Sequence, residues 1–209
     1  MPGRLTLGLY NSYDPRRFAE AHRRALVRAA PLALAFGANL ATFGFPFDDL
    51  AAHGGRSRED RSRGAEAKRG VTDDADVKLS TPLEIAEFIA RTTSVAAEAA
   101  PLVELARAGR FAVFELPKRA FPPQLGAVVL TTEHAKCPRD TSARAIAREL
   151  VDGKSQLLVF GLGPHGTPDD VATMAQWEFD VTGKNHGLET ATAMGAVVAS
   201  VAAHVEMLS

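Results

Sequence analysis

Two short apolar runs, at residues 127–131 and 156–160, constrain the fold of this chain more than any other feature of its sequence. Each consists largely of aliphatic side chains and is bounded by turn or helix patterns, as expected of a strand that is buried on both faces. Strands of that kind occur in parallel sheets that helices cover on both sides. The sequence therefore predicts an α/β fold built around a mostly parallel sheet flanked by helices.

The rest of the chain alternates between strand and helix patterns, as the crossover connections of a parallel sheet require. Further strands are expected at residues 4–10, 38–45, 111–116 and 178–181. Helices are expected over residues 14–29, 82–92, 101–108, 141–151, 169–176 and 188–207. Asp14 should cap the first of these helices, which Pro31 should kink or end. Asp140 or Thr141 should cap the helix at 141–151.

The 209 residues are expected to form a single domain with a flexible insertion at about residues 54–76. Residues 54–70 contain no aliphatic side chain larger than alanine and alternate Gly, Ser, Arg, Asp and Glu. The formal net charge is -1, so any RNA binding must come from local patches rather than from the overall field. Charge-free runs are too short or too interrupted by Gly and Pro to cross a membrane, and no signal peptide is evident. A cytoplasmic protein is expected.

The single cysteine, Cys137, excludes an internal disulfide. His134 and His165 do not form a ligand-spacing pattern with it, so no metal site is predicted.

A glycine-rich loop follows the second apolar run directly, with the sequence Gly-Leu-Gly-Pro-His-Gly at residues 161–166. This loop matches G-x-G-x-x-G, and Asp180 follows at roughly the 20-residue distance of a dinucleotide fingerprint. That fingerprint belongs at the first strand-to-helix turn of a sheet, whereas here only one short strand and one helix follow. Pro164 also removes a backbone donor. A dinucleotide site and a tight turn that binds nothing stay open as alternatives.

Three loops, each following a strand, carry the remaining motifs. They are Val-Val-Leu-Thr-Thr-Glu-His at 128–134, the glycine-rich loop, and Val-Thr-Gly-Lys-Asn-His-Gly-Leu-Glu-Thr at 181–190, which leads into a helix rich in Ala and Gly. This arrangement resembles the three-loop cofactor site of SPOUT-type RNA methyltransferases. The whole chain outside the insertion, from Leu-Tyr-Asn-Ser-Tyr-Asp-Pro at 9–15 to the Leu-Glu-Thr-Ala-Thr-Ala run at 188–193, is similar to an uncharacterised archaeal SPOUT-like family.

The resemblance implies a C-terminal trefoil knot, S-adenosylmethionine as the cofactor, and RNA (tRNA or rRNA) as the substrate. Thr131 and Thr132 would lie at the first loop. Backbone contacts to the methionine and ribose portions would come from Gly161, Leu162, Gly163 and Gly166. The adenine would be enclosed by Val181, Gly183, Gly187, Leu188 and Thr190.

The catalytic residues are harder to assign from the sequence. The Ser-Leu-Asn run of ribose-methylating SPOUT groups reads Gly187-Leu188-Glu189 here. Glu189 could cap the final helix or accept a proton from a base nitrogen. The first helix carries five arginines, and the resemblance implies that Arg23 or Arg24 enters an active site. A non-catalytic knot protein that binds RNA or a partner is the alternative function.

The final helix predicts a homodimer. Ala191, Gly195, Val198, Ala202 and Val205 recur at alternating spacings of three and four residues. The opposite side is almost uncharged, so this helix needs cover on both sides. We expect a second copy of the chain to supply that cover, and an arginine of the first helix to act in the neighbour's active site.

Overall fold

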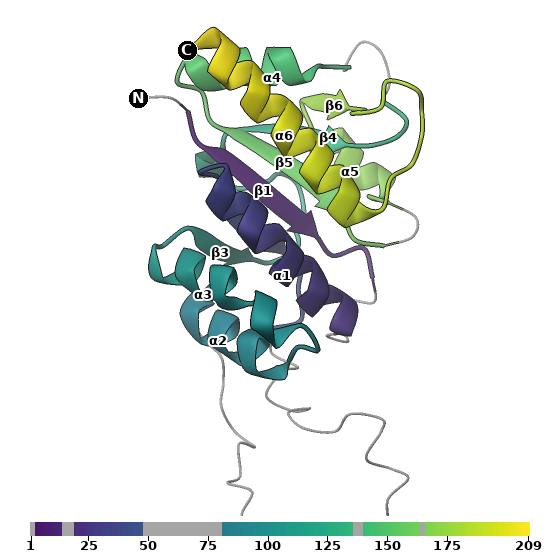
Figure 1. The fold of residues 1–209 in the computed structure, drawn as a ribbon. Helices are drawn as coiled ribbons and strands as arrows, with labels where there is room; N and C mark the ends of the chain where they lie inside the picture. Colours follow the sequence, from purple (N-terminus) through teal and green to yellow (C-terminus); the bar gives the residue numbers. More distant parts are fainter. Residues whose placement is uncertain (1–2, 14–18, 48–80, 136–139, 164–165) are drawn as a thin grey trace, which may run out of the picture.

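The structure is a computed structural model, and it describes residues 3–13, 19–47, 81–135, 140–163 and 166–209 (Figure 1). The predicted insertion at 54–76 and the predicted cap Asp14 lie outside these ranges.

Six strands form one sheet in which every pair is parallel. They are β1 (Leu5–Tyr10), β2 (Asn39–Phe43), β3 (Phe111–Phe114), β4 (Ala127–Thr131), β5 (Gln156–Gly161) and β6 (Trp177–Phe179). Their spatial order is β3-β2-β1-β5-β4-β6. The two runs that anchor the sequence argument, β4 and β5, lie inside the sheet, which explains their aliphatic character. The predicted α/β fold with a parallel sheet flanked by helices is confirmed.

Side chains of successive strand residues enter two separate cores, as the period of two in a strand requires. In β5, Leu158 and Phe160 join the larger core, whereas Leu157 and Val159 join the smaller one. The larger core is covered by α1 (Glu20–Ala35), α2 (Pro82–Thr92), α3 (Ala100–Arg107), α4 (Ala143–Val151) and α6 (Thr190–Leu208). The smaller core is covered by α5 (Asp169–Met174) and by Phe121. Figure 1 shows α1, α4 and α6 side by side over one face of the sheet.

Two predicted helix boundaries are corrected by the structure. Helix α1 continues past Pro31 to Ala35, because its buried residues on both sides of the proline pack into the larger core and hold the helix together. Helix α4 is capped by Ser142 rather than by Asp140 or Thr141, since the Ser142 Oγ accepts a hydrogen bond of 3.2 Å from the Ala145 amide. That bond satisfies one of the free amides of the first turn.

Helix α6 is the most apolar element of the chain. Met194, Val197, Val198 and Val201 are buried, whereas an outward stripe of Thr192, Ala196, Ala199, Ala203, Glu206 and Met207 is exposed. By length and composition alone, α6 is suited to span a membrane, and 22% of its apolar window is buried within the protein. The charge-free runs of the sequence predicted no such segment. One such helix is weak evidence for a membrane span, because core helices of water-soluble proteins satisfy the same criterion.

The connections place three strand ends together. Strand β4 lies between β5 and β6 in the sheet. The chain therefore passes from β4 to its neighbour β5 and then crosses β4 to form β6 on the other side. The carboxyl ends of these three parallel strands therefore share one edge of the sheet, where ligands of open α/β proteins usually bind. The trefoil knot stays a prediction.

Candidate functional site at the carboxyl edge

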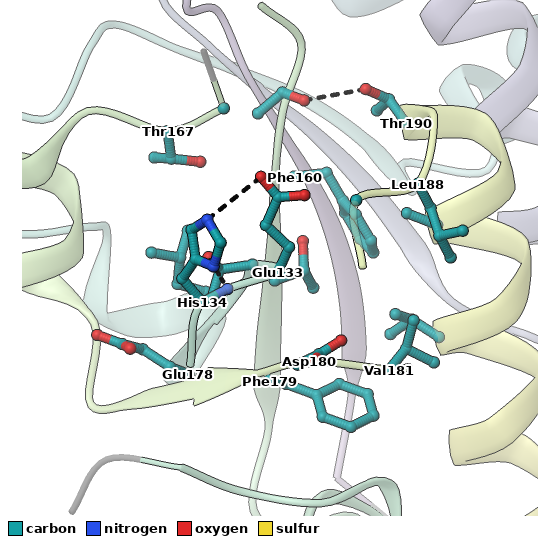
Figure 2. A pocket seen from close by; sticks show the side chains of 18 of the residues that line it. Glu133, His134, Phe160, Thr167, Glu178, Phe179, Asp180, Val181, Leu188 and Thr190 are labelled. Carbon is teal, nitrogen blue, oxygen red and sulfur yellow. Dashed lines mark hydrogen bonds and ion pairs between the residues drawn. The ribbon is translucent and has the colours of Figure 1, made fainter. Parts of the chain in front are cut away.

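A cavity of about 820 Å³ lies over the carboxyl ends of β4, β5 and β6 (Figure 2). Three loops enclose it, and we name them by the strands that they follow. Loop 1 comprises residues 132–135 and 140–142 after β4, loop 2 comprises 162–163 and 166–168 after β5, and loop 3 comprises 180–189 after β6. The volume lies in the range of pockets that bind small organic ligands.

Hydrogen bonds hold the strand ends and loops in register. The Thr131 hydroxyl donates to the Val159 carbonyl at 2.8 Å, and the Thr132 amide donates to the Phe179 carbonyl at 3.1 Å. The hydroxyl of Thr190, the first residue of α6, donates to the Gly161 carbonyl at 3.1 Å (Figure 2). The first turn of α6 is thereby joined to the end of β5, so that loop 3 closes over the cavity.

Most of the residues that the resemblance assigned to the cofactor line this cavity. They are Thr131, Thr132, Gly161, Gly163, Gly166, Val181, Gly187, Leu188 and Thr190. Two assigned residues do not. The Leu162 side chain is buried in the larger core, and Gly183 lies outside the lining, in the turn of loop 3 where its φ is 60°.

The amides of the two glycines in loop 2 are hydrogen-bonded within the protein. The Gly163 amide donates to the Ser12 Oγ at 2.6 Å, and the Gly166 amide donates to the Gly163 carbonyl at 3.0 Å. A side chain at Gly163 would also meet Ser12, because an added Cβ would lie 2.8 Å from the Ser12 carbonyl oxygen. Gly163 is therefore required for packing against the loop that follows β1, and its substitution does not test ligand binding alone.

Loop 3 is organised by Asp180. Its carboxylate accepts hydrogen bonds from the Thr182 amide and hydroxyl at 2.8 and 2.6 Å and from the Asn185 amide at 2.9 Å. Burial alone would raise the pKa of Asp180, but these hydrogen bonds and one from Gly183 outweigh it and lower the pKa. Asp180 therefore stays ionised and keeps loop 3 in shape.

The cavity lining combines apolar and acidic surfaces. Phe179, Val181, Leu188 and Val197 contribute apolar side chains, and in Figure 2 the first three lie on the side of α6. The carboxylates in the lining are Glu133, Asp169, Glu178 and Asp180. Among the described lining residues there is no lysine or arginine. Such a cavity favours a ligand that has an apolar part and carries positive charge.

The three predicted catalytic residues do not line the cavity. Glu189 caps α6, because its Oε2 accepts from the Ala191 and Thr192 amides at 2.9 and 3.2 Å. Arg23 pairs with Glu20 at 3.3 Å. Arg24 pairs with Glu20 at 3.6 Å and donates to the Ser94 hydroxyl. A neighbouring hollow of about 190 Å³ contains Arg24 and Glu189 in its lining.

Asn11, which follows β1, is a structural residue in this molecule. It is 3% exposed, and its Nδ2 donates to the Gly44 carbonyl at 2.8 Å after β2. The described residues contain no group of three His, Cys, Asp or Glu side chains that could hold a metal ion. Cys137 and His165 lie outside the described residues.

Sequence reasoning missed Glu133 and His134 as cavity residues. Both line the cavity, and their side chains form an ion pair of 3.6 Å when His134 is protonated. Their place in the sequence could have indicated a site role, since both residues follow a buried parallel strand and therefore lie at its carboxyl end. Glu178 and Phe179 could not be found in this way, because they belong to β6 itself.

The class that these features define is that of open α/β folds: a parallel sheet whose last three strands end at one cavity at its carboxyl edge. The chain belongs to the family described as protein of unknown function (DUF531), whose model matches residues 5–202. It is 32% identical over 203 residues to uncharacterized protein MJ0224 of Methanocaldococcus jannaschii, covering 95% of this chain and 93% of the relative. The expected membership of an uncharacterised archaeal family is confirmed.

Solved structures share the fold at low sequence identity. A putative methylase family protein from Neisseria gonorrhoeae matches with a TM-score of 0.53 and 15% identity, covering 98% of this chain and 84% of that one. A probable methyltransferase from Bordetella pertussis Tohama I matches with a TM-score of 0.52 and 14% identity, covering 97% and 96%. An AdoMet bound rRNA methyltransferase from Sinorhizobium meliloti has a TM-score of 0.48 and 15% identity; this chain covers 58% of its length. The first two likenesses, with TM-scores above 0.5, concern the fold alone.

Proposed function

We propose that this chain is an S-adenosylmethionine-dependent methyltransferase whose substrate is RNA, either tRNA or rRNA. The observation that carries the proposal is the convergence of the three loops of the SPOUT-like motif on one acidic cavity. Two fold neighbours with TM-scores above 0.5 are described as a putative methylase and a probable methyltransferase, which supports the same chemistry. RNA as the substrate, and a trefoil knot that shapes the site, rest on the resemblance of the loops.

The residues of the cavity fit this cofactor. The apolar side chains of Phe179, Val181 and Leu188 would hold the adenine ring. The carboxylates of Asp169 and Asp180 in the lining would attract the sulfonium and ammonium charges. When bound, the cofactor supplies a methyl group that its positive sulfur makes electrophilic. The protein's part is to hold that group beside the acceptor atom and to exclude water.

A dinucleotide fits the cavity poorly. Its two phosphates would meet a lining of carboxylates with no described lysine or arginine. Phosphates usually bind at the N-terminus of the helix after the glycine-rich loop. Here that helix, α5, has only six residues and carries Asp169 and Asp170 in its first turn. Those carboxylates already occupy the positive end of the helix and would repel a phosphate.

We further propose a homodimer through α6. The buried and half-buried seam predicted from the sequence, which includes Val198, faces the rest of the chain. The outward stripe of α6, which is uncharged from Thr192 to Ala203, is the surface left for a partner copy. In such a dimer Arg23 or Arg24 would act at the neighbour's cavity.

The test of the proposed activity is methyl transfer to RNA. Wild-type protein is expected to transfer labelled methyl groups from S-adenosylmethionine to unfractionated, unmodified tRNA or rRNA. The variant Ala193→Phe, which fills the cavity from α6, is expected to lose transfer. The control Ala145→Phe places the same side chain on the exposed face of α4 and is expected to keep it. Cofactor binding without transfer to either RNA would favour the non-catalytic alternative.

A further inference from the structure

We propose that Glu133 is the catalytic residue that removes the proton from the methyl acceptor; this inference rests on the proposed function. Glu133 lies in loop 1, two residues beyond the end of β4, and its side chain projects into the middle of the cavity (Figure 2). The side chain is 46% exposed, so an incoming nucleotide can reach its carboxylate.

The other three carboxylates of the lining differ from Glu133 in their hydrogen bonds, their exposure or their position. Asp180 accepts the hydrogen bonds that shape loop 3. Glu178 is 3% exposed and therefore out of reach of a nucleotide. Asp169 is exposed and begins α5, so it lies outside the three loops that enclose the cavity. Glu133 is the exposed carboxylate of the lining that a loop of the cavity carries.

Two neighbours lie close to the Glu133 carboxylate. One is Gly187 of loop 3, since a Cβ added there would meet the Glu133 Oε2 and the carboxylate would have to move. The adjacent residue His134 is anchored through its amide, which donates to the Thr132 hydroxyl at 3.1 Å. Its Nε2 lies 3.6 Å from the Glu133 Oε1, and the His134 side chain is 68% exposed.

The position of Glu133 gives the acceptor's proton a destination. Methyl transfer would form a bond from the acceptor atom to the methyl carbon and break the carbon–sulfur bond, whose electron pair would remain on a neutral thioether sulfur. The acceptor's hydrogen would pass to the Glu133 carboxylate as a proton and from there to water, with His134 beside it. No oxidant or further reactant is needed. A base of this kind typically contributes about 10²–10⁴-fold to the rate.

The inference also narrows the substrate. A proton acceptor is useful only when the nucleophile still carries a hydrogen, as an N–H of a base or a hydroxyl does. A ring nitrogen that offers a free lone pair needs no base. We therefore infer that the methylated atom is an N–H or O–H group of RNA.

Carbodiimide labelling followed by mass spectrometry tests where the Glu133 carboxylate points, without measuring activity. In wild-type protein Glu133 should be labelled, should stay labelled when S-adenosylhomocysteine is bound, and should become protected once unfractionated tRNA or rRNA is also bound. Protection by S-adenosylhomocysteine alone would make Glu133 a cofactor ligand and overturn the inference. Continued labelling with bound RNA would overturn it as well.

Two variants complete the test. Glu133→Gln keeps the shape of the side chain but cannot accept the proton, so single-turnover methyl transfer should fall by about 100-fold or more. Its affinity for S-adenosylmethionine should stay within about threefold of wild type. Glu104→Gln, on the exposed face of α3, should change neither. Wild-type rates in Glu133→Gln would refute the role of Glu133, whereas a wild-type protein that binds no cofactor would refute the proposed function itself.

Discussion

At the scale of single residues, a buried polar network around His22 and Asn11 lies next to the residue that binds the glycine-rich loop, Ser12. The His22 Nδ1 accepts from the Ala19 amide at 3.0 Å, so the ring proton lies on Nε2, which donates to the Asn11 Oδ1 at 2.8 Å. Asn11 in turn holds the end of β2 through Gly44. Next to Asn11, Ser12 accepts from the Gly163 amide. The network thus links α1, two strand ends and one wall of the cavity.

The network makes stability depend on pH. Burial lowers the pKa of His22, so the folded chain binds a proton at this ring less readily than the unfolded chain. The stabilisation is complete above the unfolded pKa of about 6.5 and is lost as the pH falls from there toward the folded pKa. The free energy of unfolding should therefore decrease below pH 6.5 by at most about 1.4 kcal/mol per pH unit.

Urea unfolding at pH 7.5, 6.5 and 5.5 measures this effect, with His22→Gln as the comparison. The variant should be less stable at all three pH values. Its free energy of unfolding should also depend less on pH, because the contribution of His22 is missing. Glu20 and Asp180 have lowered pKa values, so their effect on the free energy of unfolding appears at more acidic pH. They therefore do not mask the effect of His22. An identical slope in the two proteins would contradict the assignment.

Residue roles were predictable only in part. The glycines and threonines of the three loops were found because motifs report which loop faces a ligand. The backbone contact expected of Leu162 stays a prediction; a motif does not report the direction of a side chain, and the Leu162 side chain points into the core. Glu189 was recognised as either a cap or a base, and only the hydrogen bonds to Ala191 and Thr192 decide for the cap.

At the scale of elements, every strand and helix of the described chain that the sequence predicted is present, most of them with shifted ends. Periodicity locates an element well, because it reflects burial over many residues. The ends depend on single hydrogen bonds, such as the one that makes Ser142 the cap of α4. Tertiary packing also overrides local preference, as it does where α1 continues through Pro31.

The outward stripe of α6 gives a prediction at this scale. Wild-type protein at tens of micromolar should sediment as a dimer, because the stripe offers small apolar side chains that let two helices approach closely. Ala199→Glu places a charge in the middle of the stripe and should shift the protein to monomer. Ala100→Glu, on the exposed start of α3, should remain dimeric. Sedimentation equilibrium distinguishes these outcomes, and a monomeric wild type would exclude this interface.

At the scale of the whole molecule, the strand order was beyond the reach of the sequence. Alternating strands and helices predict parallel pairing, but they do not specify which strands become neighbours. The order determines the site: since β5 and β6 lie on opposite sides of β4, residues from three distant segments form one cavity. The acidic character of that cavity likewise became visible only when Glu133, Asp169, Glu178 and Asp180 were brought together.

Calorimetric titration with S-adenosylmethionine tests the central claim most directly. The cavity should bind one cofactor per chain with a Kd between about 1 µM and 1 mM, the range typical of enzyme ligands. NAD⁺ should not bind, because its phosphates would face the carboxylates of the lining. Saturable binding of S-adenosylmethionine that Ala193→Phe abolishes and Ala145→Phe preserves is the predicted result. No binding of S-adenosylmethionine to the wild-type protein at millimolar concentration would contradict the account.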